Sequence, residues 1–218
     1  MKRLILILLL FNIAIISAHQ PRLVMDKEFT IENPLKVENP EVSQAFYGVL
    51  KGKPEYYKIS SEKDFNLYVG IVVPDRKETR TDFLVEISSK DKNITLNGET
   101  FKWEKFFEQF AGDNYLKGPE YEERVLKGEY LIKVSNPDNR GSYSLVVGKI
   151  EAFPPKEAIN AIFSLPQLKK DFFAKSPFTA YFNYIGIFLL VMLVVLAGVI
   201  VLLVFIIRRI KRPKTQIL

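Results

Sequence analysis

An uninterrupted apolar stretch in the last fifth of the sequence constrains the fold more than any other feature. Residues 185 to 207 read IGIFLLVMLVVLAGVIVLLVFII and contain no charge. A helix rises about 1.5 Å per residue, so this stretch would extend roughly 34 Å, more than the hydrocarbon core of a bilayer at about 30 Å. The sequence therefore predicts a transmembrane helix over residues 184–207 that anchors the chain in a lipid bilayer.

A cluster of cations follows this stretch directly. It consists of Arg208, Arg209, Lys211, Arg212 and Lys214. Cytoplasmic flanks of membrane helices carry an excess of Lys and Arg, so these residues are expected to determine the topology. Residues 208–218 would then form a basic cytoplasmic tail. This pattern predicts a single-pass, type I protein of the cell membrane, with its N-terminal domain outside the cytoplasm.

The net charge of +6 reflects this topology rather than a basic binding surface. Of the 31 basic residues, two precede the first apolar segment and five lie in the tail, whereas all 25 acidic residues lie between the two apolar segments. The expected extracytoplasmic part is therefore close to neutral. Nucleic-acid-binding domains carry clustered positive charge, so we expect no nucleic-acid partner.

Cysteine is absent from the sequence, and His19 is the single histidine. A domain of about 160 residues can bury enough apolar surface to fold without disulfides, and the composition favours a prokaryotic envelope protein. Most nucleophile–base pairs and most zinc sites use Cys or His. We therefore expect no enzyme activity, no catalytic or metal-binding residues and no cofactor. A hydrolase that uses carboxylates alone is the remaining enzyme hypothesis.

Residues 1–18 have the three parts of a signal peptide. These are a charged start at Lys2 and Arg3, an apolar segment from Leu4 to Ile16, and small residues at Ser17 and Ala18. We expect cleavage after Ala18; the alternative is an uncleaved anchor, which the shortness of the apolar segment disfavours. Residues 19–41 contain three prolines and short alternating pieces, which predict an extended lead-in.

Residues 42–150 are expected to form a β-sandwich, so the fold class is mainly β. Short runs of β-branched and aromatic residues, several alternating with polar ones, predict strands, and the clusters of Gly, Pro, Ser and Asp between them predict turns. Short strands at regular spacing are typical of a sandwich. The expected strands are 45–50, 55–60, 65–73, 82–88, 95–96, 121–125, 129–135 and 141–147.

Two parts of this region carry a different pattern. Aromatic residues recur near helical spacing in residues 99–110, which predicts a short helix or an irregular crossover that covers the core. A loop is expected from Gly112 to Glu120. Residues 136–141 read NPDNRG, a turn sequence that predicts a hairpin between the strands on either side of it.

Residues 151–183 are expected to form an amphipathic juxtamembrane segment. Pro155 suits the first turn of a helix over 156–163, and a second helical piece is expected over 166–173. This segment either rests on the outer membrane interface or packs under the sandwich, and the sequence leaves both alternatives open. An interfacial aromatic belt then precedes the span, formed by Phe178, Tyr181, Phe182 and Tyr184.

Four segments of the sandwich region, 47–52, 55–59, 126–134 and 141–148, resemble the bacterial pre-peptidase C-terminal domains. The strongest part is the pattern G-x-Y-x-I-x-V from Gly128, followed by G-x-Y-x-L-x-V from Gly141. The resemblance implies a compact, jelly-roll-like β-sandwich of the kind found beside secreted proteases and on cell surfaces. Those domains usually carry an aspartate pair near the second strand, often at a calcium site. Here Glu55-Tyr56-Tyr57 stands at that place, so calcium binding is not carried over.

An aromatic-rich insertion is the expected contact surface for a partner, because it interrupts otherwise regular strands. Its residues are Trp103, Tyr115, Glu120 and Tyr121. Neighbouring carboxylates could suggest metal ligands or paired catalytic acids, but charged residues that alternate along a solvated strand need no such role. These carboxylates are Asp113, Glu120, Glu122 and Glu123.

Together these features predict a non-catalytic binding or scaffolding module that one helix holds outside the membrane. Its partner would be a protein, a glycan or an envelope polymer. One alternative is an accessory subunit whose membrane helix pairs with another membrane protein. A second is a cargo adaptor similar to the p24 family, which shares the length, signal, sandwich and single span but usually carries a disulfide and a coiled-coil stem.

Overall fold

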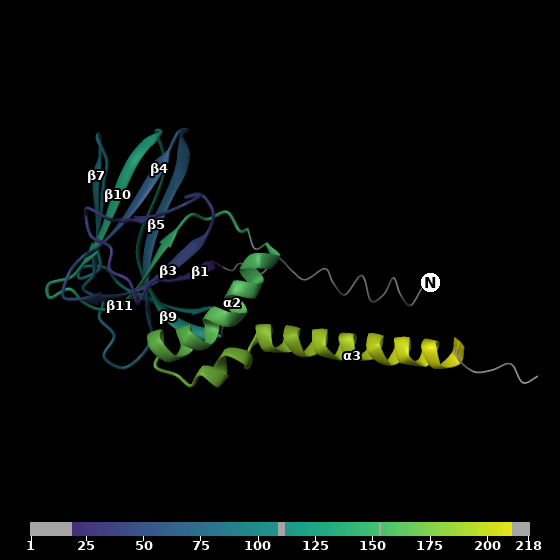
Figure 1. Ribbon diagram of the computed structural model, residues 1–218. Helices are drawn as coiled ribbons and strands as arrows, with labels where there is room; N and C mark the ends of the chain where they lie inside the picture. The colour runs from purple at the N-terminus through teal and green to yellow at the C-terminus, as the bar shows by residue number, and fades with distance from the viewer. Residues whose placement is uncertain (1–18, 109–111, 153, 211–218) are drawn as a thin grey trace, which may run out of the picture.

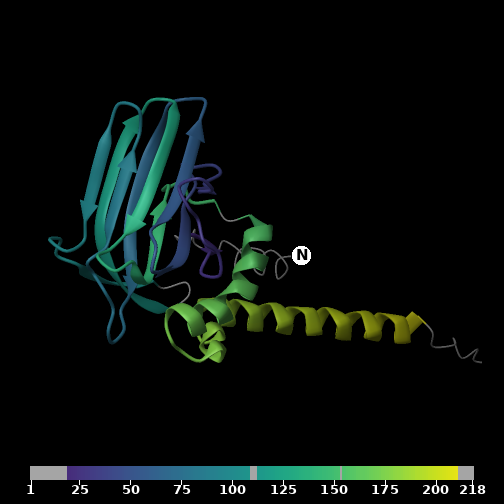
Figure 2. The ribbon, with the colours of Figure 1, turned by 60° about the vertical axis from the view of Figure 1, so that its left-hand side comes forward.

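The computed structural model describes residues 19–108, 112–152 and 154–210, which form a two-sheet β-sandwich with a helical layer on one face (Figure 1). A long helix at the end of this layer projects away from the sandwich, as a second view also shows (Figure 2). The mainly β fold class expected from the sequence is confirmed. The expected signal peptide lies outside the described residues.

The two sheets contain six and five strands. Sheet A has the order β1 (Gln20–Leu23), β3 (Gln44–Lys51), β11 (Arg140–Val147), β5 (Phe65–Pro74), β9 (Asp113–Val125) and β8 (Glu104–Glu108). Sheet B has the order β2 (Leu35–Lys36), β4 (Glu55–Ser61), β10 (Gly128–Ser135), β6 (Leu84–Ser88) and β7 (Asn93–Asn97). Neighbouring strands are antiparallel except at β1–β3 and β2–β4, where the lead-in adds a parallel edge strand to each sheet.

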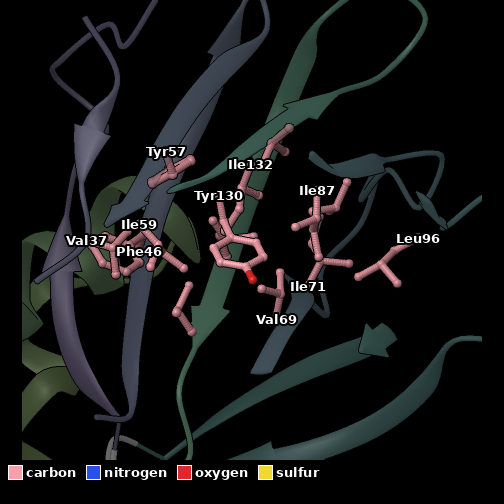
Figure 3. Close-up of a cluster of buried hydrophobic side chains, with 14 of the residues drawn as sticks. Val37, Phe46, Tyr57, Ile59, Val69, Ile71, Ile87, Leu96, Tyr130 and Ile132 are labelled. Carbon is pink, nitrogen blue, oxygen red and sulfur yellow. The ribbon is translucent and has the colours of Figure 1, made fainter. Parts of the chain in front are cut away.

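The core lies between the sheets and is built from alternate residues of the central strands. In β4, Tyr57 and Ile59 are fully buried, whereas Lys58 between them is half-buried on the opposite face. Ile71 of β5 and Ile132 of β10 contribute from different sheets to the same cluster (Figure 3). Burying one such aliphatic side chain contributes about 1.5 to 3 kcal/mol. The alternation in the sequence thus decides which face of each central strand points inward.

The aromatic run at residues 101–108 does not form the predicted helix or crossover. Residues Glu104–Glu108 form β8, an edge strand of sheet A that pairs with β9. Phe106 and Phe107 are about half exposed, so they do not cover the core as expected. Backbone hydrogen bonding to the long neighbour β9 outweighs the near-helical spacing of the aromatic residues. Phe110 lies outside the described residues.

The predicted hairpin at residues 136–141 is also wrong, because β10 belongs to sheet B and β11 to sheet A. The connection crosses between the sheets. The Asn136 side chain accepts a hydrogen bond from the Arg140 N–H at 2.9 Å and donates one to the Arg140 carbonyl at 2.7 Å. Asn139 and Gly141 both have positive φ, at 51° and 122°. These two residues turn the chain so that both tyrosine-containing strands face the same core.

The helical layer begins with α2 (Pro155–Gln167), in which Pro155 occupies the predicted first position. α2 continues into a π-helical turn, η1 (Leu168–Phe172), so the two expected helical pieces form one unit. The buried side chains of this unit include Leu165, Leu168 and Phe172, and they pack on Ala45 and Tyr47 from the outer face of β3. These buried apolar residues of the juxtamembrane segment therefore pack against the sandwich.

An ion pair joins the two ends of the folded region. The guanidinium of Arg22 in β1 donates hydrogen bonds of 2.6 and 3.2 Å to the carboxylate oxygens of Glu157 in α2. The pair holds the first turns of α2 beside the edge of sheet A. Bidentate geometry of this kind is the favourable form of an Arg–carboxylate contact.

After a short 3₁₀ helix, η2 (Pro177–Tyr181), the chain forms α3 (Tyr184–Ile210). The window Leu190–Arg209 is long and apolar enough to cross a membrane, and none of it is buried inside the protein. Of the five cations expected to determine topology, Arg208 and Arg209 form the last turn of this helix. Lys211, Arg212 and Lys214 lie outside the described residues.

Candidate functional site

Tyr115, one of the predicted contact residues, does not reach the surface. The expected loop 112–120 is instead the first part of β9. Tyr115 is 3% exposed, its ring packs on Phe172 and Phe173, and its hydroxyl lies 3.0 Å from the hydroxyl of Tyr47. It therefore belongs to the contact between sheet A and the helical layer.

Trp103 is partly buried and packs against the main core. Its indole N–H donates a hydrogen bond of 2.8 Å to the carbonyl of Gly98. Gly98 and Gly118 lie so close to the indole that a Cβ at either position would approach it to 2.9 and 2.6 Å. The two glycines thus make room for the indole, which packs on the edge of the main core. Trp103 is a structural residue here rather than an exposed platform.

Glu120 and Tyr121 lie further along β9 and do not join Trp103 and Tyr115 in one patch. Glu120 is exposed and accepts hydrogen bonds of 2.8 Å from the hydroxyl of Tyr68 and from Lys117. Tyr121 packs partly against the core, and its hydroxyl donates to Glu123. Of the four predicted contact residues, Trp103 and Tyr115 therefore serve in packing, whereas Glu120 and Tyr121 belong to a solvated network of ion pairs.

The carboxylates of β9 are engaged with cations in the same way. Asp113 is fully buried beside Lys169 and Lys175, Glu122 pairs with Lys149, and Glu123 pairs with Lys92. Within the described ranges, no three His, Asp or Glu side chains gather as a metal-binding group would require.

A groove of about 1040 Å³ lies on sheet B, and we name it the sheet B groove. Its floor includes Lys58, Leu131 and Ser88, which are register neighbours on β4, β10 and β6. Its walls are the segments 31–34, 89–92 and 123–128. The helical layer packs on the outer face of sheet A, so it leaves this groove uncovered (Figures 1 and 2).

Cations outnumber anions in the sheet B groove. The cations are Lys36, Lys58, Lys90, Lys92, Arg124 and Lys127, and the anions are Glu32, Asp91, Glu123 and Glu129. Lys58 pairs with Glu129 at 2.6 Å, and Lys92 pairs with Glu123. Among the described residues, the other four cations and two anions of the groove have no ion-pair partner. The groove therefore has an excess of available positive charge.

Aromatic stacking contributes little to the sheet B groove. Tyr130 is the aromatic residue of its lining, and this side chain is 7% exposed. Its hydroxyl donates to the carbonyl of Leu126 at 2.7 Å, and its ring packs edge-on against Phe65. Neutral sugars are held mainly on exposed aromatic faces, so the groove suits recognition by charge.

A second polar feature, which the sequence reasoning missed, is a buried carboxylate that links the two sheets. Glu55 of β4 is 5% exposed and accepts a hydrogen bond of 2.5 Å from the hydroxyl of Tyr143 in β11. That hydroxyl lies 2.8 Å from the hydroxyl of Tyr57. Burial raises the pKa of Glu55 to about 7. Strand alternation offered a signal, because Glu55 lies two residues from the inward-facing Tyr57.

No protein-family model and no curated protein matches the sequence. Among solved structures, the chain is similar to the pre-peptidase C-terminal domain of a collagenase from Bacillus anthracis. The identity is 10% and the TM-score 0.32, with 60% of this chain and 95% of that chain covered. It is also similar to a beta-glucosidase from Paenibacillus barengoltzii, at 10% identity and a TM-score of 0.25, with 59% of this chain and 13% of that chain covered. The fold class rests on the two sheets themselves rather than on these similarities.

Proposed function

We propose that the protein is a membrane-anchored, extracytoplasmic binding module without catalytic activity, which presents the sheet B groove to an anionic ligand. α3 has the length and composition of an anchor. The cations that follow it favour a cytoplasmic C-terminus. The observation that carries the proposal is the position of the groove, which opens on the sheet that the helical layer leaves uncovered.

The charges of the groove indicate the chemistry of the ligand. Lys36, Lys90, Arg124 and Lys127 have no carboxylate partner among the described residues. Carboxylate or phosphate groups spaced along a ligand would pair with these side chains, and Arg124 could bind such a group with two parallel hydrogen bonds. Exposed ion pairs contribute modestly on their own, so several contacts would be needed for useful affinity.

We propose no catalytic activity because the groove lacks the side chains that general-base catalysis usually requires. The groove lining contains no His or Cys, and two of its four acidic side chains are already paired with lysines. His19 lies outside the groove in contact with the hydroxyl of Ser43, and burial lowers its pKa. General-base catalysis near neutral pH needs a titratable group within reach of its substrate.

Binding to polymeric anions tests this function. Full-length protein in lipid nanodiscs would be titrated with polygalacturonate and polyphosphate, and with dextran as a neutral control. We expect the anions to bind in a salt-sensitive manner and dextran not to bind. Replacing Lys36 and Lys127 by Ala should weaken binding about tenfold, a difference of about 1.4 kcal/mol.

The matched control replaces Lys77 and Lys102 by Ala, because both are exposed lysines outside the groove. This pair removes the same net charge and should bind as the unmodified protein does. Equal weakening in the two double variants would show that net charge, rather than the groove, attracts the polymer. Hydrolysis of either probe would contradict a role in binding alone.

A further inference from the structure

α2 carries apolar residues on two opposite faces. Ala161 and Leu165 are buried, at 3% exposure each, and Leu165 packs against the sandwich. Ile159 and Phe163 are 55% and 78% exposed. Residues four apart lie on the same face of a helix, so Ile159 and Phe163 form one continuous apolar strip on the side of α2 away from the sheet. Packing on sheet A explains the first face and leaves the second without a role.

Lysines flank this strip along the helix axis. Lys156 precedes Ile159 by one turn, and Lys170 follows Phe163 by two turns in η1; both are exposed. Of the acidic residues in 155–172, Glu157 is held by Arg22, and Asp171 is exposed. An apolar strip with Ile or Phe at its centre and lysines at its borders is the composition of a helix that lies in a membrane interface.

α2 lies beside η2, the short helix that leads into α3. η2 connects the two helices, and its Ala180 is buried in the same cluster as Leu165 of α2. In both ribbon views α2 lies on the side of the sandwich from which α3 projects (Figures 1 and 2). Phe178 and Phe182, at either end of η2, are 77% and 85% exposed.

We infer that the outer face of α2, together with these two phenylalanines, is seated in the headgroup region of the leaflet that α3 enters. The occupant of this surface is therefore the bilayer itself. Ile159 and Phe163 would contact the boundary between headgroups and acyl chains, and Lys156 and Lys170 would reach lipid phosphates. This inference rests on the proposed membrane anchorage. It adds that the sandwich is held against the bilayer with the sheet B groove directed away from the lipid.

The lack of cysteine in the sequence allows a direct test. Single cysteines would be introduced into the full chain at Ile159 or Phe163, labelled with a nitroxide, and reconstituted in vesicles of phosphatidylcholine and phosphatidylglycerol. Two reference labels would be placed at Val199, within α3, and at Thr95, exposed on β7. Collision rates with oxygen, which concentrates in lipid, and with a water-soluble nickel complex then report the depth of each label.

The oxygen-to-nickel ratio should be several-fold higher at residues 159 and 163 than at residue 95, and closer to that at residue 199. The inference is overturned if residue 199 is shielded from nickel while residues 159 and 163 resemble residue 95, and membrane anchorage then stands. If residue 199 itself resembles residue 95, the anchorage fails and the inference fails with it. All four positions are exposed in the folded protein or lie in α3, so labelling should leave the core intact.

Discussion

The Nζ atom of Lys169 in η1 lies 2.5 Å from a carboxylate oxygen of Asp113 at the start of β9, and both side chains are almost completely buried. Lys175 approaches the other oxygen of the same carboxylate at 3.0 Å. Removing a charge from water costs several kcal/mol, which only close pairing offsets. A shift of the helical layer along sheet A would separate these charges. The contact therefore fixes the position at which this layer packs.

Replacing Lys169 by Met should destabilise the protein, because it leaves Asp113 buried with Lys175 as its remaining ion-pair partner. The expected loss is about 2 to 4 kcal/mol of unfolding free energy. Trp103 fluorescence during urea unfolding of the full chain in detergent micelles would measure it. Lys170→Met is the matched control, since Lys170 is the exposed neighbour. Equal unfolding midpoints for the two variants would show that the buried pair does not fix the layer.

The raised pKa of Glu55 predicts that stability decreases as the pH rises. Below about pH 4.5 the carboxyl group is protonated in both the folded and the unfolded chain, and its contribution is fully present. Between that value and about 7 the unfolded chain ionises first, so this contribution is lost as the pH rises. The loss should be on the order of 3 kcal/mol, with no further change from this group above pH 7. The positive charge of Lys51 lowers the pKa of Glu55, whereas the negative charge of Glu28 raises it.

Glu55→Gln should abolish this part of the pH dependence, because an amide can accept the hydrogen bond from Tyr143 without titrating. Unfolding in urea would be compared at pH 5 and pH 8 for both proteins. Glu86→Gln, an exchange at a half-buried carboxylate paired with Lys133 in sheet B, serves as the control. An unchanged slope in Glu55→Gln would assign the pH dependence to other groups.

Gly141→Val should destabilise the sandwich at the crossing between the sheets. Gly141 has a φ of 122°, which a β-branched residue rarely adopts, and an added Cβ would lie 3.3 Å from the ring of Phe83. The expected cost is about 1 to 3 kcal/mol. Thermal unfolding followed by circular dichroism would measure it. As a control, Thr95→Val on the exposed face of β7 should leave the melting temperature unchanged. If the Gly141→Val protein has the same melting temperature as the Thr95→Val protein, the assigned role of this glycine is contradicted.

Neutralising the tail should disturb the orientation of the protein in the membrane. With Arg208, Arg209, Lys211, Arg212 and Lys214 all replaced by Gln, a fraction of molecules should insert with the C-terminus outside. Protease protection of a C-terminal epitope tag in sealed membrane vesicles would measure that fraction. As a control, replacing five lysines of the β-sandwich instead should leave the orientation of the protein unchanged. Complete protection in the tail variant would mean that other features set the topology.

The sequence predicted most of the strands, because runs of β-branched and aromatic residues bounded by turn residues mark them. The pairing of the strands was harder to predict, because the two patterns G-x-Y-x-I-x-V and G-x-Y-x-L-x-V fit a hairpin and a crossing between sheets equally well. Only the partners of β10 and β11, which are distant in sequence, separate the two arrangements.

The contact surface was predicted less well for a related reason. Aromatic residues at a break in the strand pattern suggested an exposed insertion, yet the space beside Trp103 depends on Gly98 and Gly118, and the burial of Tyr115 depends on a helix about fifty residues later. The sheet B groove combines Lys36, Lys58 and Arg124 from separate parts of the chain. No local pattern brings such residues together.

The ion pair between Arg22 and Glu157 also affects when this protein can finish folding. The two residues are separated by 135 positions, so β1 stays without this partner until α2 has been synthesised. Contacts of such long range slow folding, because most of the chain must be ordered before they form. α3 follows α2 closely in the sequence. The domain can therefore complete its folding only late in synthesis, when most of the chain has already been made.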